Sequence, residues 1–230
     1  SSAASDVYKR QFRIFEKKYI NLVKLIIVIM QMNFKETLKY RRSYYHLTNS
    51  SPVSDEAIRE ILEFGLLHVP SAFNSQSTRV VLLLGEHHKK LWMITKEILR
   101  KMARSAEDFT RTEAKIDTSF AAGYGTVLFF EDTAVVKKLQ ASFPTYKESF
   151  PVWSQQTSAM HQLVIWTMLE DAGFGASLQH YNPLIDKEVR KEWKINPDWE
   201  LIAQMPFGSP LQQPGNKEFT PLDDRLIVFD

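Results

Sequence analysis

Two adjacent arginines and a serine stand together at Arg41, Arg42 and Ser43, between a predicted helix and a stretch rich in turn residues. Guanidinium groups and a small hydroxyl are donors well suited to phosphate, because a planar fork of N–H groups matches the geometry of an oxyanion. Basic pairs are also common at exposed helix ends, where the helix dipole favours cations. The three residues therefore indicate either a phosphate site or a solvated helix end.

A second polar stretch, PSAFNSQ at residues 70–76, lies between a predicted helix and a predicted buried strand. Loops in such places present polar groups to ligands from a rigid scaffold. Asn74 and Gln76 each carry a donor and an acceptor, so they could hydrogen-bond the edge of a planar ring. The alternative is a polar connection whose side chains cap the neighbouring elements.

A third stretch, GFGASLQHYN at residues 173–182, follows the most apolar helix of the sequence. Gly173 and Gly175 allow a ligand to approach the backbone closely, and successive N–H groups there could meet an anion or an electron-rich ring edge. The alternative for such a glycine pair is a helix C-cap followed by a turn.

Hydrophobic periodicity predicts the elements that position these stretches. Helices are expected over residues 33–42, 54–69 (with Ser54 as N-cap), 86–103, 106–123, 133–143, 152–173 and 183–193. Strands are expected over residues 79–85, 124–132, 199–208 and 225–229, with 175–181 a strand or an extended loop. Because helices and strands alternate unevenly, we expect an α/β or α+β domain with helices around one mixed sheet. The helix over 152–173 is apolar nearly all round, which predicts a central buried helix.

The last predicted strand follows a long extended arm that contains proline and glycine, GSPLQQPGNKEFTPLDD. An apolar strand at the end of such an arm could pair with the sheet of a second subunit. An edge strand of its own sheet fits the sequence equally well.

Composition excludes several kinds of chemistry. The chain has no cysteine, so it can form no disulfide, thiolate nucleophile, zinc–thiolate site or iron–sulfur cluster. Its six histidines show no metal-ligand spacing, and a net charge of only +2 argues against a dedicated nucleic-acid binder. Any redox chemistry would therefore depend on an organic cofactor.

The first 31 residues are basic and then apolar, and precede a natural start at Met32. Their apolar run, residues 20–30, is about half the ~20 residues that span a bilayer, and Lys24 interrupts it. We interpret residues 1–31 as an upstream extension of a single domain over residues 32–230. An amphipathic helix that packs on a partner is the alternative, and a membrane span fits the pattern least.

The order of the motifs resembles the nitroreductase family of FMN-dependent oxidoreductases. After RRS come PSxxNxQ, a long apolar helix, GFGA, FGxP and a late KxxxPLDD. The variants VPSAFNSQSTRVVLL and GASLQHYNP are most similar to the fatty-acid-repression-mutant-type and copper-induced branch. The resemblance runs from about residue 32 to residue 230. It implies an α+β, three-layer fold in which helices flank a central, mostly antiparallel sheet, and a homodimer with FMN at the interface.

The resemblance also implies which residues bind the cofactor. The arginine pair with Ser43, and later Lys217, would hold the phosphate and ribityl oxygens, and the 70–76 loop would face the isoalloxazine, partly from the neighbouring subunit. The backbone of residues 174–176 would line the ring edge near N5. The implied set is Arg41, Arg42, Ser43, Tyr45, Pro70, Ser71, Ala72, Asn74, Gln76, Phe174, Gly175, Ala176, Lys217 and Arg225.

Two positions depart from the family pattern. Many members carry Lys or Arg where this chain has Tyr45, and a second cation where it has Phe219. Arg225 fits two alternatives, a replacement for the lost phosphate contact and an exposed charge at a strand end. With fewer cations beside the pyrimidine ring, reduced anionic flavin is less favoured, so we expect a lower flavin potential than in members with that cation.

The implied activity is reduction of nitroaromatics, quinones or similar electron-poor rings by NADH or NADPH, by ping-pong hydride transfer through flavin N5. No side chain need be an obligatory acid or base, no metal, nucleic acid or membrane is expected, and the expected location is the cytoplasm. Four aromatic residues could wall the flavin or simply fill the core: Phe73, Phe120, Tyr124 and Trp153.

Two other functions fit the sequence. One is a flavin-bound regulatory protein in a lipid or stress response, whose turnover is incidental and whose flavin NADH would reduce slowly. The other is a phosphate-ligand binding module without redox activity, which would be colourless.

Overall fold

The computed structural model describes residues 33–223 and 225–229 of the chain, which divides into two compact units, residues 1–40 and 41–230. In the first unit, the described part is helix α2, Phe34–Tyr40, whose Glu36 N–H donates to the side chain of Asn33. The prediction about residues 1–31 lies outside the described residues and stays a prediction. No helix within the described part of the chain is both long enough and apolar enough to cross a membrane.

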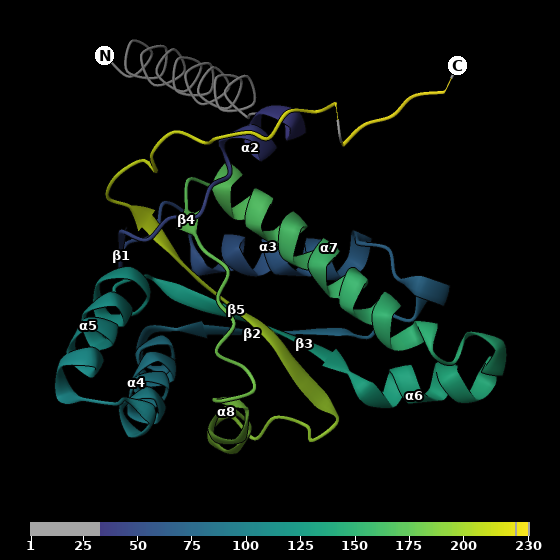
Figure 1. The fold of residues 1–230 in the computed structure, drawn as a ribbon, viewed down its shortest axis with the longest axis horizontal. Helices are drawn as coiled ribbons and strands as arrows, with labels where there is room; N and C mark the ends of the chain where they lie inside the picture. The colour runs from purple at the N-terminus through teal and green to yellow at the C-terminus, as the bar shows by residue number, and fades with distance from the viewer. Residues whose placement is uncertain (1–32, 224, 230) are drawn as a thin grey trace, which may run out of the picture. The chain divides into compact units, whose positions relative to one another are not determined.

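The second unit is built on an antiparallel sheet (Figure 1). Its strand order is β1-β5-β3-β2, with β4 paired to β5. The strands are β1 Leu47–Thr48, β2 Thr78–Leu84, β3 Gly125–Asp132, β4 Gly175–Ala176 and β5 Trp199–Pro210. Every residue of β3 is buried, so β3 forms the centre of the domain.

Helices cover both faces of the sheet, which makes three layers (Figure 1). One face carries α3 and α7, and the other carries α4, α5 and α8. The α-helices of this unit are α3 Asp55–His68, α4 Gly85–Met102, α5 Ala106–Ile116, α6 Thr133–Ser142, α7 Ser149–Asp171 and α8 Asp186–Glu192. The predicted α+β class and antiparallel sheet are therefore confirmed.

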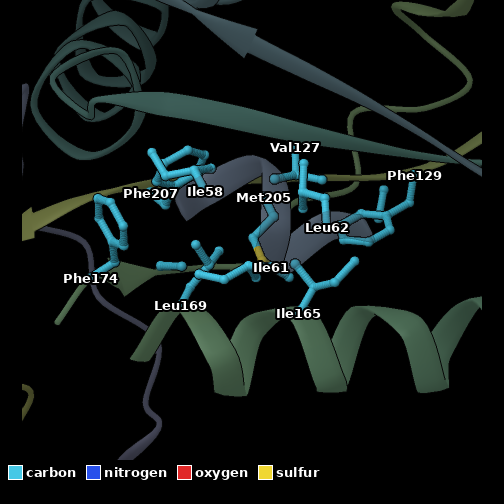
Figure 2. Close-up of a cluster of buried hydrophobic side chains, with 12 residues drawn as sticks. Ile58, Ile61, Leu62, Val127, Phe129, Ile165, Leu169, Phe174, Met205 and Phe207 are labelled. Carbon is cyan, nitrogen blue, oxygen red and sulfur yellow. The ribbon is translucent and has the colours of Figure 1, made fainter. Parts of the chain in front are cut away.

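Alternation along β3 produces two hydrophobic cores, because successive side chains of a strand point to opposite faces. Val127 and Phe129 pack with α3 and α7, where Ile58, Ile61 and Leu62 face Ile165 and Leu169 (Figure 2). Leu128 and Phe130 pack in the second core with Leu91 and Trp92 of α4 and with residues of α5 and α8.

Local signals in the sequence set several element ends. Ser54 caps α3 by accepting a hydrogen bond from the Ala57 N–H at 3.2 Å, as the sequence predicts. Helix α7 ends before Gly173, whose φ of +87° is left-handed and favours glycine.

Other predicted elements are wrong or shorter than expected. Residues 225–229 form no strand and their side chains are exposed, because no strand within the described residues pairs with them. The helix expected over 106–123 gives way after Ile116 to a π-helical turn, η2, Asp117–Ala121. Only two residues of the 175–181 stretch are in a strand, and α8 starts at Asp186, three residues after the predicted Pro183, because turns precede it.

Helix α7 also differs from the buried helix that its composition predicts. It contacts the core along one face, but Val152, Met160 and Leu163 on its surface are 55%, 40% and 43% exposed. The helix is apolar all round although a single chain covers only part of it.

Candidate functional site

The predicted phosphate residues line one cavity of about 520 Å³. Its wall is formed by the arginine motif and by the segment that follows β5. The lining residues are Arg41, Arg42, Ser43, Tyr44, Tyr45, His46, Gln212, Gln213, Pro214, Gly215 and Lys217. Three cations and a hydroxyl from distant parts of the sequence thus meet in one place, which is the donor set that a phosphate group requires.

Strand β4 positions the arginine motif. Ser43 forms a parallel bridge with Ala176, and the Tyr44 N–H donates to the Ala176 carbonyl at 2.9 Å. Because β4 is held by β5, this pairing ties the motif to the edge of the sheet. Two of the three predicted polar stretches are therefore neighbours.

Arg41 lies on an aromatic surface at the back of the cavity. Its guanidinium carbon is 4.3 Å from the centre of the Trp166 ring, a cation–π contact with α7. Its Nε is buried and has no hydrogen-bond partner. Burial lowers the pKa of Arg41, and the nearby Glu170 opposes that shift. The side chain is held in place while part of its donor capacity is unused.

Glu170, near the end of α7, lies behind this arginine. Burial raises its pKa to about 7, although the Tyr44 hydroxyl and the charge of Arg41 oppose the shift. One carboxylate oxygen, Oε1, lies 3.1 Å from the Tyr44 hydroxyl, and the other, Oε2, is buried without a partner. The cavity therefore has a carboxyl group behind it that titrates near neutral pH.

The structure gives a different reason for glycine at position 175 from the one that the sequence suggested. A Cβ atom at this position would lie 2.7 Å from Cγ of Tyr44, so a side chain here would collide with the tyrosine ring. Phe174 is buried and packs edge-on against Phe207 at 5.1 Å. The glycine allows the close approach of Tyr44, where the sequence suggested the approach of a ligand.

The 70–76 loop has an unusual backbone. It contains a short turn, η1, Ala72–Asn74, and Phe73, Asn74 and Gln76 all have positive φ, at 57°, 51° and 48°. The Gln76 N–H donates to Oγ of Ser71 at 2.9 Å, which closes the loop on itself. Left-handed backbone at such residues costs on the order of 1 to 3 kcal/mol each and persists only where the surroundings impose it.

An aromatic cluster holds the middle of this loop. The Phe73 ring lies 4.8 Å from Phe143, 5.3 Å from Phe150 and 6.3 Å from Trp153, the last nearly parallel. Tyr146 completes the cluster at 5.9 Å. Phe73 is 51% exposed, so the cluster presents an open aromatic surface beside the loop.

Buried polar groups hold the end of the loop. Ser77 and Thr78 each donate a hydroxyl hydrogen bond of 2.6 Å to Glu131, which is 1% exposed. Arg79 donates to the Gln76 carbonyl at 2.7 Å and pairs with Asp132 at 3.0 Å. The strained loop is thus fixed to β3.

The loop and the cavity lie toward opposite ends of α7. Arg41 contacts Trp166, whereas Phe73 contacts Trp153, and the separation of thirteen positions between these two tryptophans corresponds to about 20 Å of helix. Ser71, Asn74 and Gln76 do not line the cavity of their own chain.

Comparison with known proteins identifies the family. The sequence model described as "Nitroreductase family" matches residues 38–209. The chain belongs to the nitroreductase family. Two nitroreductases of Saccharomyces cerevisiae are similar along most of their length. The putative nitroreductase HBN1 is 36% identical over 197 residues, 84% of this chain and 96% of the relative. The nitroreductase FRM2 is 32% identical over 189 residues, 81% and 93%. The predicted family and branch are confirmed.

Solved nitroreductases share the fold. The nitroreductase CinD from Lactococcus lactis in complex with chloramphenicol is 42% identical, with a TM-score of 0.77 over 86% of this chain and all of CinD. CinD has also been solved with nicotinic acid and with 4-nitrophenol. A putative nitroreductase from Desulfovibrio desulfuricans in complex with FMN is 20% identical, with a TM-score of 0.61, and is similar in fold.

Some of the site residues expected from the nitroreductase resemblance lie outside the cavity. Pro70 and Ala72 belong to the separate loop, and Arg225 is exposed in the C-terminal arm and does not line the cavity. Lys217 lines it, with its ammonium 5.3 Å from the Phe219 ring. Among the four aromatic residues named for the nitroreductase site, Phe120 is fully buried in the second core.

Sequence reasoning missed the residues that support the cavity. None of the residues Tyr44, Trp166, Glu170 and Gln213 was predicted as a site residue, and they meet only through folding. The single local signal was the position of Tyr44, directly after the phosphate motif.

Proposed function

We propose that this nitroreductase binds FMN and uses NADH or NADPH to reduce nitroaromatics, quinones or similar electron-poor rings. The observation that carries the proposal is the cavity in which Arg41, Arg42, Ser43 and Lys217 converge. Each of these side chains donates hydrogen bonds, three of them carry a positive charge, and Arg41 Nε is buried without a partner. A phosphate group would satisfy this set.

Known ligands of similar proteins support the same chemistry. The FMN complex of the Desulfovibrio protein supports the flavin. The CinD complexes with nicotinic acid and 4-nitrophenol support a nicotinamide donor and a nitroaromatic acceptor. We expect ping-pong kinetics, in which the donor leaves before the acceptor enters.

We further infer a homodimer in which each site combines two chains. Ser71, Asn74 and Gln76 carry the groups that would orient a flavin ring, but they lie far from the cavity of their own chain. A second copy would bring its loop to that cavity. The exposed apolar face of α7 and the exposed residues Leu226–Phe229 provide surface for such a contact.

The roles of the side chains follow from their chemistry. The arginine pair, Ser43 and Lys217 would hold the phosphate, and the loop amides would orient the ring edge. The aromatic cluster around Phe73 would contact the planar substrate and exclude water. FMN, when bound, would supply the hydride chemistry at N5. No described side chain is needed as an acid or base, and the expected site of action is the cytoplasm.

Tyr45 lines the cavity and is 44% exposed, at the position where a cation is expected to stabilise reduced flavin. We therefore expect a flavin potential lower than in relatives that carry the cation, and a Tyr45→Lys variant with a raised potential. Photometric redox titration of both proteins measures this. A variant with an unchanged potential would contradict the assignment of Tyr45.

The proposal is tested on the purified protein. A flavin absorption spectrum, its rapid bleaching by NADH or NADPH, and reoxidation by a nitroarene or quinone are expected. Reduction much slower than turnover of known nitroreductases would favour a regulatory role, and a colourless protein that does not take up FMN would disprove the proposal.

A further inference from the structure

Part of the cavity wall is a segment with few hydrogen bonds to the rest of the domain. Residues 212–217 follow the end of β5 at Pro210, and both Gln213 and Lys217 are exposed. Just before the segment, the Leu211 N–H donates to the His46 carbonyl at 2.8 Å. Within residues 41–223 and 225–229, the one hydrogen bond between this segment and the rest of the domain joins Tyr44 and Gln213, with 3.1 Å between the hydroxyl and Oε1. We call residues 212–217 the cavity flap.

Tyr44 is a rigid attachment point for the flap. It is 4% exposed, its ring lies against Gly175, and its backbone N–H bonds to β4. Burial raises its pKa to about 12, so the hydroxyl keeps its proton at physiological pH. That proton is shared between Gln213 and Glu170, each 3.1 Å away. The position of the hydroxyl is therefore set by the sheet and by α7, independently of the flap.

Lys217 depends on this attachment because it lies four residues beyond Gln213 on the same flap, after Pro214 and Gly215. A lysine ammonium on a long side chain contributes to anion binding only while its backbone stays near the site. If the flap is attached for only a fraction of the time, the apparent affinity falls by that fraction.

We propose that Tyr44 and Gln213 are positioning residues that hold the flap over the cavity and so bring Lys217 to the phosphate of the bound flavin. This rests on the proposed FMN site. It assigns a function to Tyr44, which follows Ser43 in the cavity wall but is not one of the predicted phosphate donors, and to Gln213, which lies outside the motifs. Replacement of either residue should therefore weaken binding of the phosphate group and have little effect on binding of the flavin ring.

Comparison of FMN with riboflavin separates these effects, because riboflavin lacks the phosphate. Both flavins are titrated into the full-length protein after removal of its own flavin, with quenching of flavin fluorescence as the signal. The variants are Gln213→Ala, Tyr44→Phe, Lys217→Ala and the double variant Gln213→Ala with Lys217→Ala. Gln140→Ala is the matched control, since it removes a surface glutamine whose amide bonds only to the Lys147 carbonyl.

We expect Gln213→Ala and Tyr44→Phe to weaken FMN binding about three- to tenfold, the usual effect of one hydrogen bond, and riboflavin binding less than twofold. The double variant should bind FMN no more weakly than Lys217→Ala alone, because both changes remove the same contact. Gln140→Ala should bind both flavins as the wild type does. Trypsin should also cleave after Lys217 faster in Gln213→Ala than in the wild type.

The results that would contradict the flap proposal differ from those that would contradict the phosphate site. Equal weakening of FMN and riboflavin would show a general structural role and overturn the proposal, as would fully additive effects in the double variant. A wild-type protein that binds FMN no more tightly than riboflavin would disprove the phosphate site itself and the flap with it. If the wild type prefers FMN and Gln213→Ala keeps that preference, only the flap proposal fails.

Discussion

The two ends of α7 differ in what they contain. Near its C-terminal end, the phosphate cavity gathers charged groups from one chain around Arg41, on backbone without left-handed residues. Near its N-terminal end, the 70–76 loop, here called the ring loop, has three left-handed positions, Phe73, Asn74 and Gln76, and its polar groups do not line the phosphate cavity. In the proposed dimer, the first end binds the phosphate with residues of one chain, and the second contributes its polar groups to the site of the other chain.

This difference suggests that the two ends contribute different parts of ligand binding, one the attraction of an anion and the other the recognition of a ring edge. Charge attracts an anion without requiring fine geometry, whereas recognition of a ring edge requires donors fixed in direction. The strain at Phe73, Asn74 and Gln76 is held by an aromatic cluster and by buried hydrogen bonds to Glu131, which supply that rigidity. Strain at such positions is a known feature of ligand-binding sites.

Mixing two defective chains gives the largest expected effect. We expect Arg41→Ala/Arg42→Ala to lose phosphate binding and Asn74→Gly/Gln76→Gly to lose ring binding, with glycine chosen because both loop positions have positive φ. If each site combines the cavity of one chain with the loop of the other, half of the dimers in an equal mixture are mixed and each has one intact site. Activity should rise to about a quarter of the wild-type value.

An NADH-dependent nitroarene assay of the equal mixture measures this recovery. Co-expression with two different tags and purification through both isolates the mixed dimers, whose activity should be about half of the wild-type value. Each variant expressed alone is the control. Activity of the mixed dimers no higher than that of the single variants would show that the cavity and the loop serve the same site within one chain.

Removal of Glu131 should strongly destabilise the domain, because Glu131 anchors the end of the ring loop. Glu131→Ala leaves two buried hydroxyls, those of Ser77 and Thr78, without their acceptor and opens a cavity, so we expect a loss of about 3 kcal/mol in the free energy of unfolding. Urea denaturation measures it. Glu86→Ala removes an exposed carboxylate with a surface lysine partner and should leave the unfolding curve unchanged. Equal curves for both variants would contradict the anchoring role of Glu131.

The features that were predicted correctly from the sequence are those that depend on residues close together in the chain. The N-cap Ser54 and the apolar run that predicts a strand over residues 124–132 are local signals, and both elements formed as expected. The meeting of Arg41 with Lys217 followed only from the family resemblance, since no local rule joins residues so far apart.

What the sequence could not predict depends on long-range contacts. Tyr44 meets Glu170 across 126 positions and Gln213 across 169, so neither contact leaves a local trace. The apolar run at Leu226–Phe229 reads as a strand, but strand formation needs a neighbour with unpaired backbone groups, and the described chain places none there. The exposed side of α7 could not be predicted for the same reason, because composition shows that a helix face is apolar but does not show what covers it.

Glu170 provides a smaller test at the phosphate end. Burial raises its pKa to about 7 in the folded chain, above its ordinary 4.5, so its contribution to stability is full below about pH 4.5 and is lost as the pH rises through 7. Glu170→Gln stays neutral. After discounting for its partial exposure, we expect this variant to be more stable than the wild type by about 1 kcal/mol at pH 8 and equal to it near pH 4.5.

Urea denaturation at the two pH values checks this prediction. His88 serves as an internal reference, because burial lowers its pKa to about 4 and both proteins therefore lose its contribution together as the pH falls below about 6.5. A variant less stable than the wild type at pH 8 would show that the attraction between Glu170 and Arg41 outweighs the cost of burying the carboxylate.

The smallest expected effect is a change in stability at Phe73. It tests whether backbone strain distinguishes the ring loop from the phosphate cavity. Phe73→Ala and Phe73→Gly both remove the ring, but only glycine relieves the φ of 57°, so Phe73→Gly should be the more stable by about 1 kcal/mol. Tyr146 belongs to the same aromatic cluster and lies in the short helical turn η3, Pro144–Tyr146. There the order should reverse, because glycine is less favourable than alanine in helical backbone. The same order at both positions, measured by urea denaturation, would mean that the loop is not held in a left-handed conformation, and the contrast between the two ends of α7 would then lie in charge alone.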